Sequence, residues 1–240
     1  MRDRSSPRNP LAVLFVTVCL LAPVLLSSGY AAPVVYLILG LANLAVLGGI
    51  DVPRYARTLL VLSGVSLGLF ALNVLAPAEG TDGLARGIAV FLRSVSLISL
   101  SVGFIFAVDP YSLVRALMVR LGLEPKVGFA LFAGWNTIPL LRRDLGIIEK
   151  AQALRLGRRR RTLRDRTNTA TALLAGAIRH GERVALSMAA RGLDRDTPRT
   201  FLKDSPWTRA DTLYCVAGFL ASGTTSFVLA ARGLFAFYLG

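Results

Sequence analysis

Three Ala-Arg-Gly tripeptides contain the side chains of this sequence that are best suited to recognising a partner. They occupy residues 85–87, 190–192 and 231–233. Arginine carries a planar guanidinium with five N–H donors that matches a carboxylate, and a glycine commonly follows the last residue of a helix. Such a tripeptide can therefore present a cation at a helix end. In a chain this rich in Ala, Arg and Gly the repeat alone is a weak signal, so the position of each copy must decide which one has a function.

The residue types that perform catalysis or bind metals are scattered along the chain. The single histidine, His180, has no neighbouring cluster of cysteines or carboxylates, so we expect no zinc site. No G-x-x-x-x-G-K-[ST] motif is present, so the chain has no P-loop for ATP. Asp109, Asp144 and Glu149 show no pairing of a nucleophile with a base. We therefore expect a protein that is not an enzyme and needs no cofactor.

The composition points to a membrane protein with a basic part outside the bilayer. Hydrophobic residues make up 54% of the 240 residues, and the mean hydropathy is +0.57. The chain also has 28 Lys and Arg against 14 Asp and Glu. Nucleic-acid binding is the usual alternative explanation of so basic a chain. It does not explain long uncharged runs, so we expect no nucleic-acid partner.

Five uncharged or nearly uncharged runs predict five transmembrane helices. The first run extends over 42 positions from Asn9 to Ile50, which is enough for two spans of about 20 residues each. The predicted spans cover residues 11–28, 31–50, 57–77, 86–108 and 211–232. Arg93 lies inside the fourth span, where it either faces protein or reaches toward the outer surface. Cys19 and Cys215 also fall inside spans, where buried free thiols are expected.

The distribution of arginines predicts the orientation in the membrane. The loop that contains Arg54 and Arg57 is basic, whereas the next loop carries only Glu79 and Asp82. Basic loops stay in the cytoplasm, so the N-terminus is expected inside the cell. The chain then divides into a membrane part (1–108), a cytoplasmic or interfacial part (109–210) and a last span (211–240). Of the three tripeptides, only the one with Arg191 would lie in the cytoplasm.

The cytoplasmic part is expected to form helices. We predict one over residues 111–121, a second from 126 that passes Pro139 at the membrane boundary and continues to Gly157, and a third over about 171–191. The third has an apolar stripe of Leu173, Ala177, Val184 and Met188. Arg155 and Arg191 would each end a helix just before a glycine. The helix dipole alone favours arginine there by about 0.3–1 kcal/mol, so the residues leave both partner docking and an ordinary helix end open.

Four stretches in a fixed order resemble the transmembrane T component of energy-coupling factor (ECF) transporters, which take up vitamins, cobalt or nickel. They are VDPYSLVRAL (108–117), LEPKVGFALF (123–132), IPLLRRDLGIIEKAQALRLG (138–157) and ALSMAARGLDRDTPRT (185–200). The resemblance covers nearly the whole chain. It implies an all-α integral membrane protein with five transmembrane helices and cytoplasmic coupling helices.

The resemblance also implies partners and site residues. In that family, two arginine motifs dock into two ABC-type ATPase subunits, and the T component holds a small substrate-binding membrane subunit that selects the substrate. The matching residues here are Gln152, Arg155, Gly157, Ala190, Arg191 and Gly192. The second motif is complete. The first has Leu154 and Leu156 where the family usually has Ala and Gly, which puts the tightness of that contact in question.

Two alternatives remain beside a coupling subunit in the cell membrane. One is a membrane scaffold whose basic run, Arg158 to Arg161, binds anionic membrane lipid at about 1 kcal/mol per residue. The other is a membrane enzyme that acts on lipids through the scattered carboxylates. Separate charge substitutions in the basic run and at Arg191 would distinguish a scaffold from a coupling subunit, because only a coupling subunit depends far more on Arg191.

Overall fold

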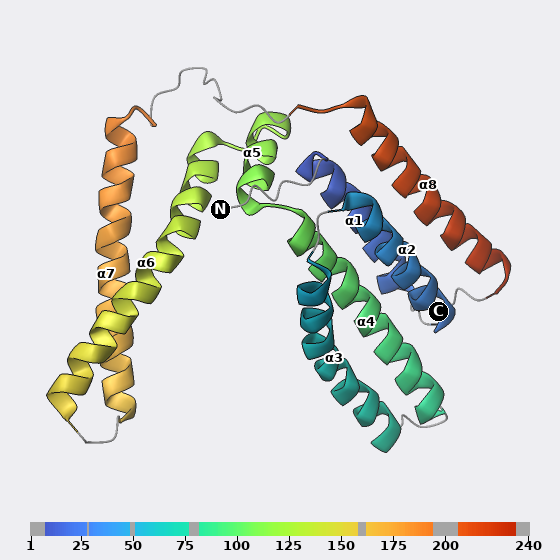
Figure 1. Ribbon diagram of the computed structural model, residues 1–240, viewed down its shortest axis with the longest axis horizontal. Helices are drawn as coiled ribbons and strands as arrows, with labels where there is room; N and C mark the ends of the chain where they lie inside the picture. Colours follow the sequence, from blue (N-terminus) through green and yellow to red (C-terminus); the bar gives the residue numbers. More distant parts are fainter. Residues whose placement is uncertain are drawn as a thin grey trace. The chain divides into compact units, whose positions relative to one another are not determined.

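The computed structural model describes residues 8–27, 29–48, 51–76, 82–157, 162–193 and 206–233, and their regular structure is entirely helical (Figure 1). The helices are α1 (Pro10–Leu26), α2 (Ala31–Leu47), α3 (Val52–Leu75), α4 (Gly83–Ala107), α5 (Pro110–Arg120), α6 (Pro125–Leu156), α7 (Leu163–Ala190) and α8 (Arg209–Ala231). The expected all-α membrane class is therefore confirmed.

Each predicted span coincides with a helix. α3, α4 and α8 are long and apolar enough to cross a bilayer, whereas α1 and α2 are apolar helices of 17 residues each. α3 begins at Val52, earlier than the expected residue 57. The prediction placed the boundary at Arg57 because it followed the uncharged run, but the helix also includes the charged residues before that run. Both cysteines are free thiols on half-buried residues.

The chain forms two compact units. Unit 1 comprises Met1–Ala116 and Ser205–Gly240, and unit 2 comprises Leu117–Asp204. Unit 1 thus brings the first four helices together with α8, the last helix in the chain. Unit 2 contains the end of α5 and all of α6 and α7.

In unit 1, α8 packs against α1 in the parallel direction. The backbone carbonyl of Cys19 accepts a hydrogen bond of 2.6 Å from the Ser222 hydroxyl. Nearer the start of both helices, a Cβ atom at Gly218 would lie only 2.7 Å from the side chain of Val16. This close approach requires glycine at position 218. It also brings the two most distant spans of the sequence into direct contact.

The other helices of unit 1 alternate in direction. Tyr36 of α2 donates to the Ser222 carbonyl of α8 at 2.8 Å, and Tyr214 near the start of α8 donates to Asn43 near the end of α2. α2 and α8 are therefore antiparallel. α2 is parallel to α4, because the close contact of Gly40 with Leu100 is followed farther along both helices by that of Leu44 with Gly103.

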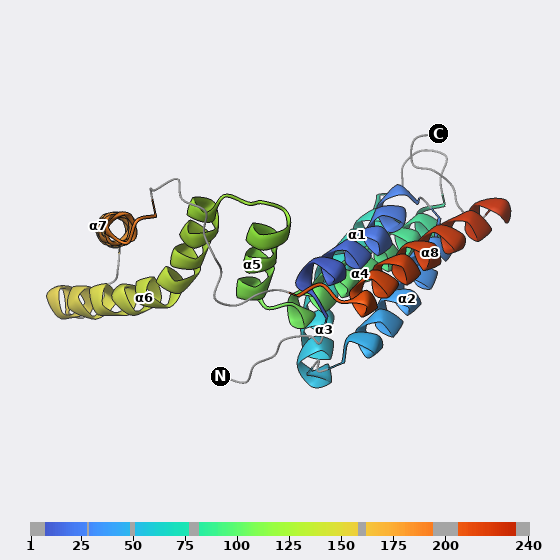
Figure 2. The same ribbon diagram turned by 90° about the horizontal axis from the view of Figure 1, so that it is seen from above.

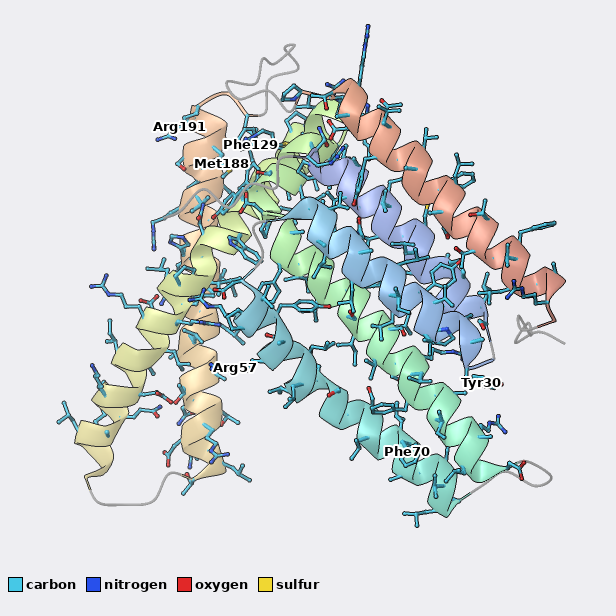
Figure 3. All side chains as sticks on the ribbon, turned by 45° about the vertical axis from the view of Figure 1, so that its right-hand side comes forward. Tyr30, Arg57, Phe70, Phe129, Met188 and Arg191 are labelled. Atoms are coloured by element: carbon cyan, nitrogen blue, oxygen red, sulfur yellow. The ribbon has the colours of Figure 1, made fainter. Side chains whose placement is uncertain are left out.

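α3 is antiparallel to α4 and completes the alternation. The Tyr55 hydroxyl hydrogen-bonds the Ser99 hydroxyl at 2.6 Å, while Phe70, later in α3, contacts Phe91, earlier in α4, edge to face. α1, α3 and α8 consequently begin at one end of unit 1, which we call the Asn9 end. α2 and α4 begin at the opposite end, near Tyr30 (Figure 3). The segment between α4 and α8 leaves and returns at the Asn9 end.

A buried polar cluster joins the starts of α1 and α8 at the Asn9 end. The Asp211 carboxylate is only 3% exposed and accepts hydrogen bonds from the backbone N–H groups of Asn9 (3.0 Å) and Thr208 (2.9 Å). Arg8 donates to the Ala210 carbonyl at 2.6 Å and stacks over the Tyr214 ring. This cluster was not predicted from the sequence. Its local signal is the capping box Thr208-Arg-Ala-Asp211.

Candidate functional site

The structure separates the three Ala-Arg-Gly tripeptides as their positions suggested. Arg86 lies in the first turn of α4, and Arg232 follows the last residue of α8. Because α4 and α8 are antiparallel, both arginines lie at the end of unit 1 opposite to Asn9. Arg191 alone belongs to unit 2, where it follows the last residue of α7.

α6 carries the first candidate arginine. It is one helix of 32 residues, and Pro139 lies inside it without ending it. Arg155 lies in its last turn and is exposed. The helix ends where Gly157 adopts φ +57°, a conformation that residues with a Cβ rarely adopt, and the Gly157 N–H donates to the Ala153 carbonyl at 3.0 Å. The predicted basic run Arg158 to Arg161 lies outside the described residues.

α7 carries the second candidate arginine, and it begins earlier than predicted. The expectation that this helix starts near residue 171 is wrong, because a capping box starts it at Leu163. Thr162 and Asp165 each satisfy the backbone N–H of the other at this start. The predicted stripe of Leu173, Ala177, Val184 and Met188 is half-buried, in the helix that contacts α6. No residue of α7 is fully buried.

The C-terminus of α7 closes with a Schellman motif around the Arg191-Gly192 pair. The Gly192 N–H donates to the Ala189 carbonyl at 2.8 Å, and the Leu193 N–H donates to the Met188 carbonyl at 3.0 Å. Gly192 has φ +81°, as the motif requires. Arg191 is exposed at this end of the helix (Figure 3). Ala190 and Gly192 on either side add almost no bulk around it.

The two arginines have different surroundings. Leu154, next to Arg155, is 87% exposed, and Leu163, at the start of α7, is 80% exposed. The corresponding neighbour of Arg191 is Ala190, which offers only a methyl group. Leu154 therefore adds an exposed apolar side chain next to Arg155, whereas Ala190 adds almost none next to Arg191.

Gln152 faces the neighbouring helix. Its Nε2 donates to the Asp165 backbone carbonyl at 3.2 Å, and its Oε1 accepts from the Thr169 hydroxyl at 2.7 Å. Both partners lie in the first two turns of α7. The end of α6, with Arg155, is thus joined to the beginning of α7, and Arg191 lies at the far end of that same helix (Figure 1), which Figure 2 shows viewed along its axis.

The remaining candidate residues are dispersed. Arg93 is half-buried within α4. Asp109 accepts hydrogen bonds from the backbone N–H (3.0 Å) and hydroxyl (3.1 Å) of Ser112, and so caps the start of α5. In the described part of the chain, no group of three or more His, Cys, Asp or Glu is placed to hold a metal ion.

Comparison with known families identifies the chain. The model of the cobalt transport protein family, CbiQ, matches residues 1–200. A comparison with curated proteins gives no match. Since the match covers most of the 240 residues, the chain belongs to the CbiQ family of cobalt transport proteins. That family is one of membrane transport components and not of enzymes.

Proposed function

We propose that this member of the CbiQ family is the coupling subunit of an ATP-driven micronutrient importer. It would link ATP hydrolysis by two ATPase subunits to the uptake of cobalt or a related nutrient. A small substrate-binding membrane subunit would select the nutrient. The family match supports a transport component of the membrane, and the arrangement of α6 and α7 supports the coupling role.

The observation that carries this proposal is the separation of the two arginines within unit 2. Gln152 contacts the first turns of α7, so Arg155 lies near the beginning of that helix. Arg191 lies at its end, 28 residues later. At 1.5 Å per residue, α7 spans about 42 Å, which exceeds the roughly 30 Å diameter of a small domain. Two helix ends this far apart suit two separate docking sites.

The chemistry of each end suits an acidic groove on a partner. Each arginine lies at a helix C-terminus, and at both ends the glycine N–H already satisfies a carbonyl of the last turn. The guanidinium groups are exposed and can bind carboxylates with two parallel hydrogen bonds. A helix that begins at one contact and ends at the other can pass movement of the partners to the rest of unit 2.

The direction of the helices in unit 1 supports a cytoplasmic location for unit 2. The connections to unit 2 leave from the Asn9 end, where α3 begins with Arg54 and Arg57. Basic residues favour the cytoplasmic side of a membrane. We propose that α1 and α2 also cross the bilayer. α1 and α3 both begin at the Asn9 end of unit 1, so the chain crosses the bilayer once in α1 and returns in α2 before α3 begins.

The test compares charge reversal at the two docking residues with the same change elsewhere on the same helices. Arg155→Glu is paired with Arg142→Glu on α6, and Arg191→Glu is paired with Arg183→Glu on α7; all four side chains are exposed. Each variant is extracted in mild detergent, and co-purified chains are identified by mass spectrometry. ATP-dependent uptake of radiolabelled cobalt is then measured in membrane vesicles.

We expect two ATPase subunits to co-purify with the unaltered chain and with both control variants. The docking variants should lose them and lose uptake, while their expression and insertion stay normal. Equal losses in docking and control variants would instead indicate a basic scaffold for anionic lipid. Normal co-purification in both docking variants would overturn the coupling proposal.

A further inference from the structure

The resemblance assigns Gln152 to the contact with the ATPases, but the contacts of its side chain point elsewhere. Both ends of its amide group are occupied by α7: Nε2 by the Asp165 carbonyl and Oε1 by the Thr169 hydroxyl. The residue is half-buried, whereas Ala151, Ala153, Leu154 and Arg155 around it are exposed. Gln152 therefore differs from its neighbours in facing the inside of the α6–α7 pair.

The hydrogen bonds fix the orientation of the amide. Thr169 has a single hydroxyl proton and two acceptors within reach, the Gln152 Oε1 at 2.7 Å and the Asp165 carbonyl at 2.9 Å. If the proton goes to Oε1, the Nε2 group supplies the Asp165 carbonyl and all three groups are satisfied. A reversed amide would place Oε1 against that carbonyl, where two acceptors repel. The observed arrangement is the one that satisfies every group.

The same contact reaches the start of α7. Asp165 is the acidic member of the capping box, and its carboxylate accepts from the Thr162 N–H (2.8 Å) and hydroxyl (2.7 Å). Gln152 binds the backbone of this residue and is itself bound one turn later by Thr169. We call these residues, Gln152, Thr162, Asp165 and Thr169, the Gln152 bridge. It joins the last two turns of α6 to the first two turns of α7.

Arg155 follows Gln152 by three residues. On an α-helix this corresponds to about 4.5 Å along the axis and a rotation of about 300°, so the direction of one side chain determines the direction of the other. When Gln152 is held against α7, Arg155 is turned about 60° away from α7, toward the exposed side. The Gln152 bridge thus sets the direction in which Arg155 is presented.

We propose that Gln152 is a positioning residue for Arg155 and makes no contact with the ATPase itself. This inference rests on the proposed coupling function. Loss of the bridge should weaken docking at Arg155 and leave docking at Arg191 unchanged, because Arg191 lies at the opposite end of α7 and is held by its own Schellman motif.

Two substitutions weaken the bridge from opposite sides, and each removes one of the two hydrogen bonds between Gln152 and α7. Gln152→Glu keeps the size of the side chain but replaces the amide donor by a carboxylate facing the Asp165 carbonyl. Thr169→Val keeps the shape of the side chain and removes the hydroxyl. The matched control is Thr171→Val, since Thr171 is exposed and, among the described residues, its hydroxyl bonds only to the Thr167 carbonyl of its own helix at 3.0 Å.

Position-specific crosslinking to the ATPases in the assembled complex measures each end separately. A photoreactive benzoylphenylalanine replaces Ala153 in one series and Ala189 in another, and both positions are exposed. With Gln152→Glu or Thr169→Val we expect the crosslink from position 153 to fall about two- to tenfold, which corresponds to the loss of one of the two hydrogen bonds between Gln152 and α7. The crosslink from position 189 should stay the same, as should both crosslinks with Thr171→Val.

A rescue experiment separates positioning from direct contact. In a background without Cys19 and Cys215, Gln152→Cys combined with Thr169→Cys is treated with a short, reducible bis-thiosulfonate reagent. The reagent should restore the crosslink from position 153, and reduction should abolish it again. Each single cysteine variant treated with the same reagent serves as the control.

The outcomes distinguish this inference from the proposed function. If Arg155→Glu abolishes docking at position 153 while Gln152→Glu and Thr169→Val do not, positioning is wrong and the coupling function stands. If Gln152→Glu acts while Thr169→Val does not, and the cysteine reagent fails to restore the crosslink from position 153, Gln152 is a direct contact. If both crosslinks fall together, the substitutions act through folding, which also overturns the inference. If neither Arg155→Glu nor Arg191→Glu affects docking, the coupling function itself fails.

Discussion

Unit 1 and unit 2 both consist of α-helices, but they differ in how completely those helices bury their side chains. In unit 1, buried side chains such as Val13, Val24 and Tyr36 form a core, and buried hydroxyl groups hydrogen-bond between helices. In unit 2, α7 has no fully buried residue, and Leu154 and Leu163 are exposed. Unit 1 thus has a buried core beneath an apolar surface that includes the exposed Leu60 and Leu75 of α3, whereas α7 in unit 2 buries no residue completely.

From this difference we expect substitutions in the two units to affect different properties of the protein. Changes in unit 1 should act on folding, and changes at the ends of α6 and α7 should act on partner binding with little effect on folding. Each experiment below tests this division.

The largest effect is expected at Arg191. Arg191→Glu should weaken ATPase binding by about 2–5 kcal/mol, or roughly 30- to several-thousandfold, because it removes one partner of a buried charge pair at an interface. Arg155→Glu should act in the same direction but less strongly, since Leu154 supplies an apolar contact that remains. Titration of detergent-solubilised variants with purified ATPases measures both affinities.

The thermal stability of the Arg191 and Arg155 variants supplies the control for this experiment. It should change little, because the lost interaction with the helix dipole is worth only about 0.3–1 kcal/mol. Equal affinities in the two variants would contradict the expected asymmetry. A large loss of stability would contradict the division between the units.

The next largest effect is expected at Asp211 and concerns folding. Asp211→Ala should destabilise unit 1 by about 2–4 kcal/mol, because it removes a helix cap and leaves the buried Asn9 N–H without its acceptor. The matched control is Asp82→Ala, since Asp82 precedes α4 but its side chain makes no capping hydrogen bond. Thermal unfolding in detergent, followed by size-exclusion chromatography, measures the difference. Equal midpoints for the two variants would show that the polar cluster contributes nothing.

These two predictions also show what the sequence reveals and what it does not. The apolar helices and the all-α class follow from uncharged runs, because a bilayer requires about 20 apolar residues per helix. The early start of α7 is a local signal that was missed, the capping box of Thr162 and Asp165. The contact of Asp211 with Asn9 joins residues 202 positions apart, and no local pattern specifies such a partner.

The orientation of Gln152 belongs to the same class. The sequence places it three residues before Arg155 and suggests a shared role. Only the position of α7 shows that its side chain is directed to Asp165 and Thr169, away from the exposed side of α6. A helix pattern gives the angle between two side chains, but the direction of both depends on which neighbouring helix they meet.

A smaller effect is expected from adding one methyl group to a glycine in each unit. Gly218→Ala in unit 1 should destabilise the protein by about 1–3 kcal/mol, because the new Cβ atom would lie 2.7 Å from Val16. Gly181→Ala in α7 meets no atom within 4 Å and should stabilise that helix by up to about 1 kcal/mol. Thermal unfolding of the two variants in the same detergent tests the contrast. Destabilisation by both substitutions would show that α7 is packed as tightly as the bundle.

The smallest effect on stability is expected at Leu154, where it is also the most informative. Because Leu154 is 87% exposed, Leu154→Ala should change the free energy of unfolding by no more than about 0.5 kcal/mol and leave the unfolding midpoint nearly unchanged. In an interface, the same truncation would remove buried apolar area worth about 1.5–3 kcal/mol. We therefore expect a roughly tenfold or greater loss of ATPase affinity with an unchanged midpoint.

The reciprocal substitution, Ala190→Leu, shows whether the leucine matters at Arg155 specifically. Ala190 is exposed, so a leucine there should also leave the midpoint unchanged. If the groove that receives Arg191 is shaped for the small Ala190 and Gly192, the added bulk should weaken binding, whereas the same residue type strengthens it at position 154. Improved binding of Ala190→Leu would mean that Arg155 and Arg191 enter grooves of the same shape, each of which accepts a neighbouring leucine. Opposite responses would show that each end is matched to a groove of its own.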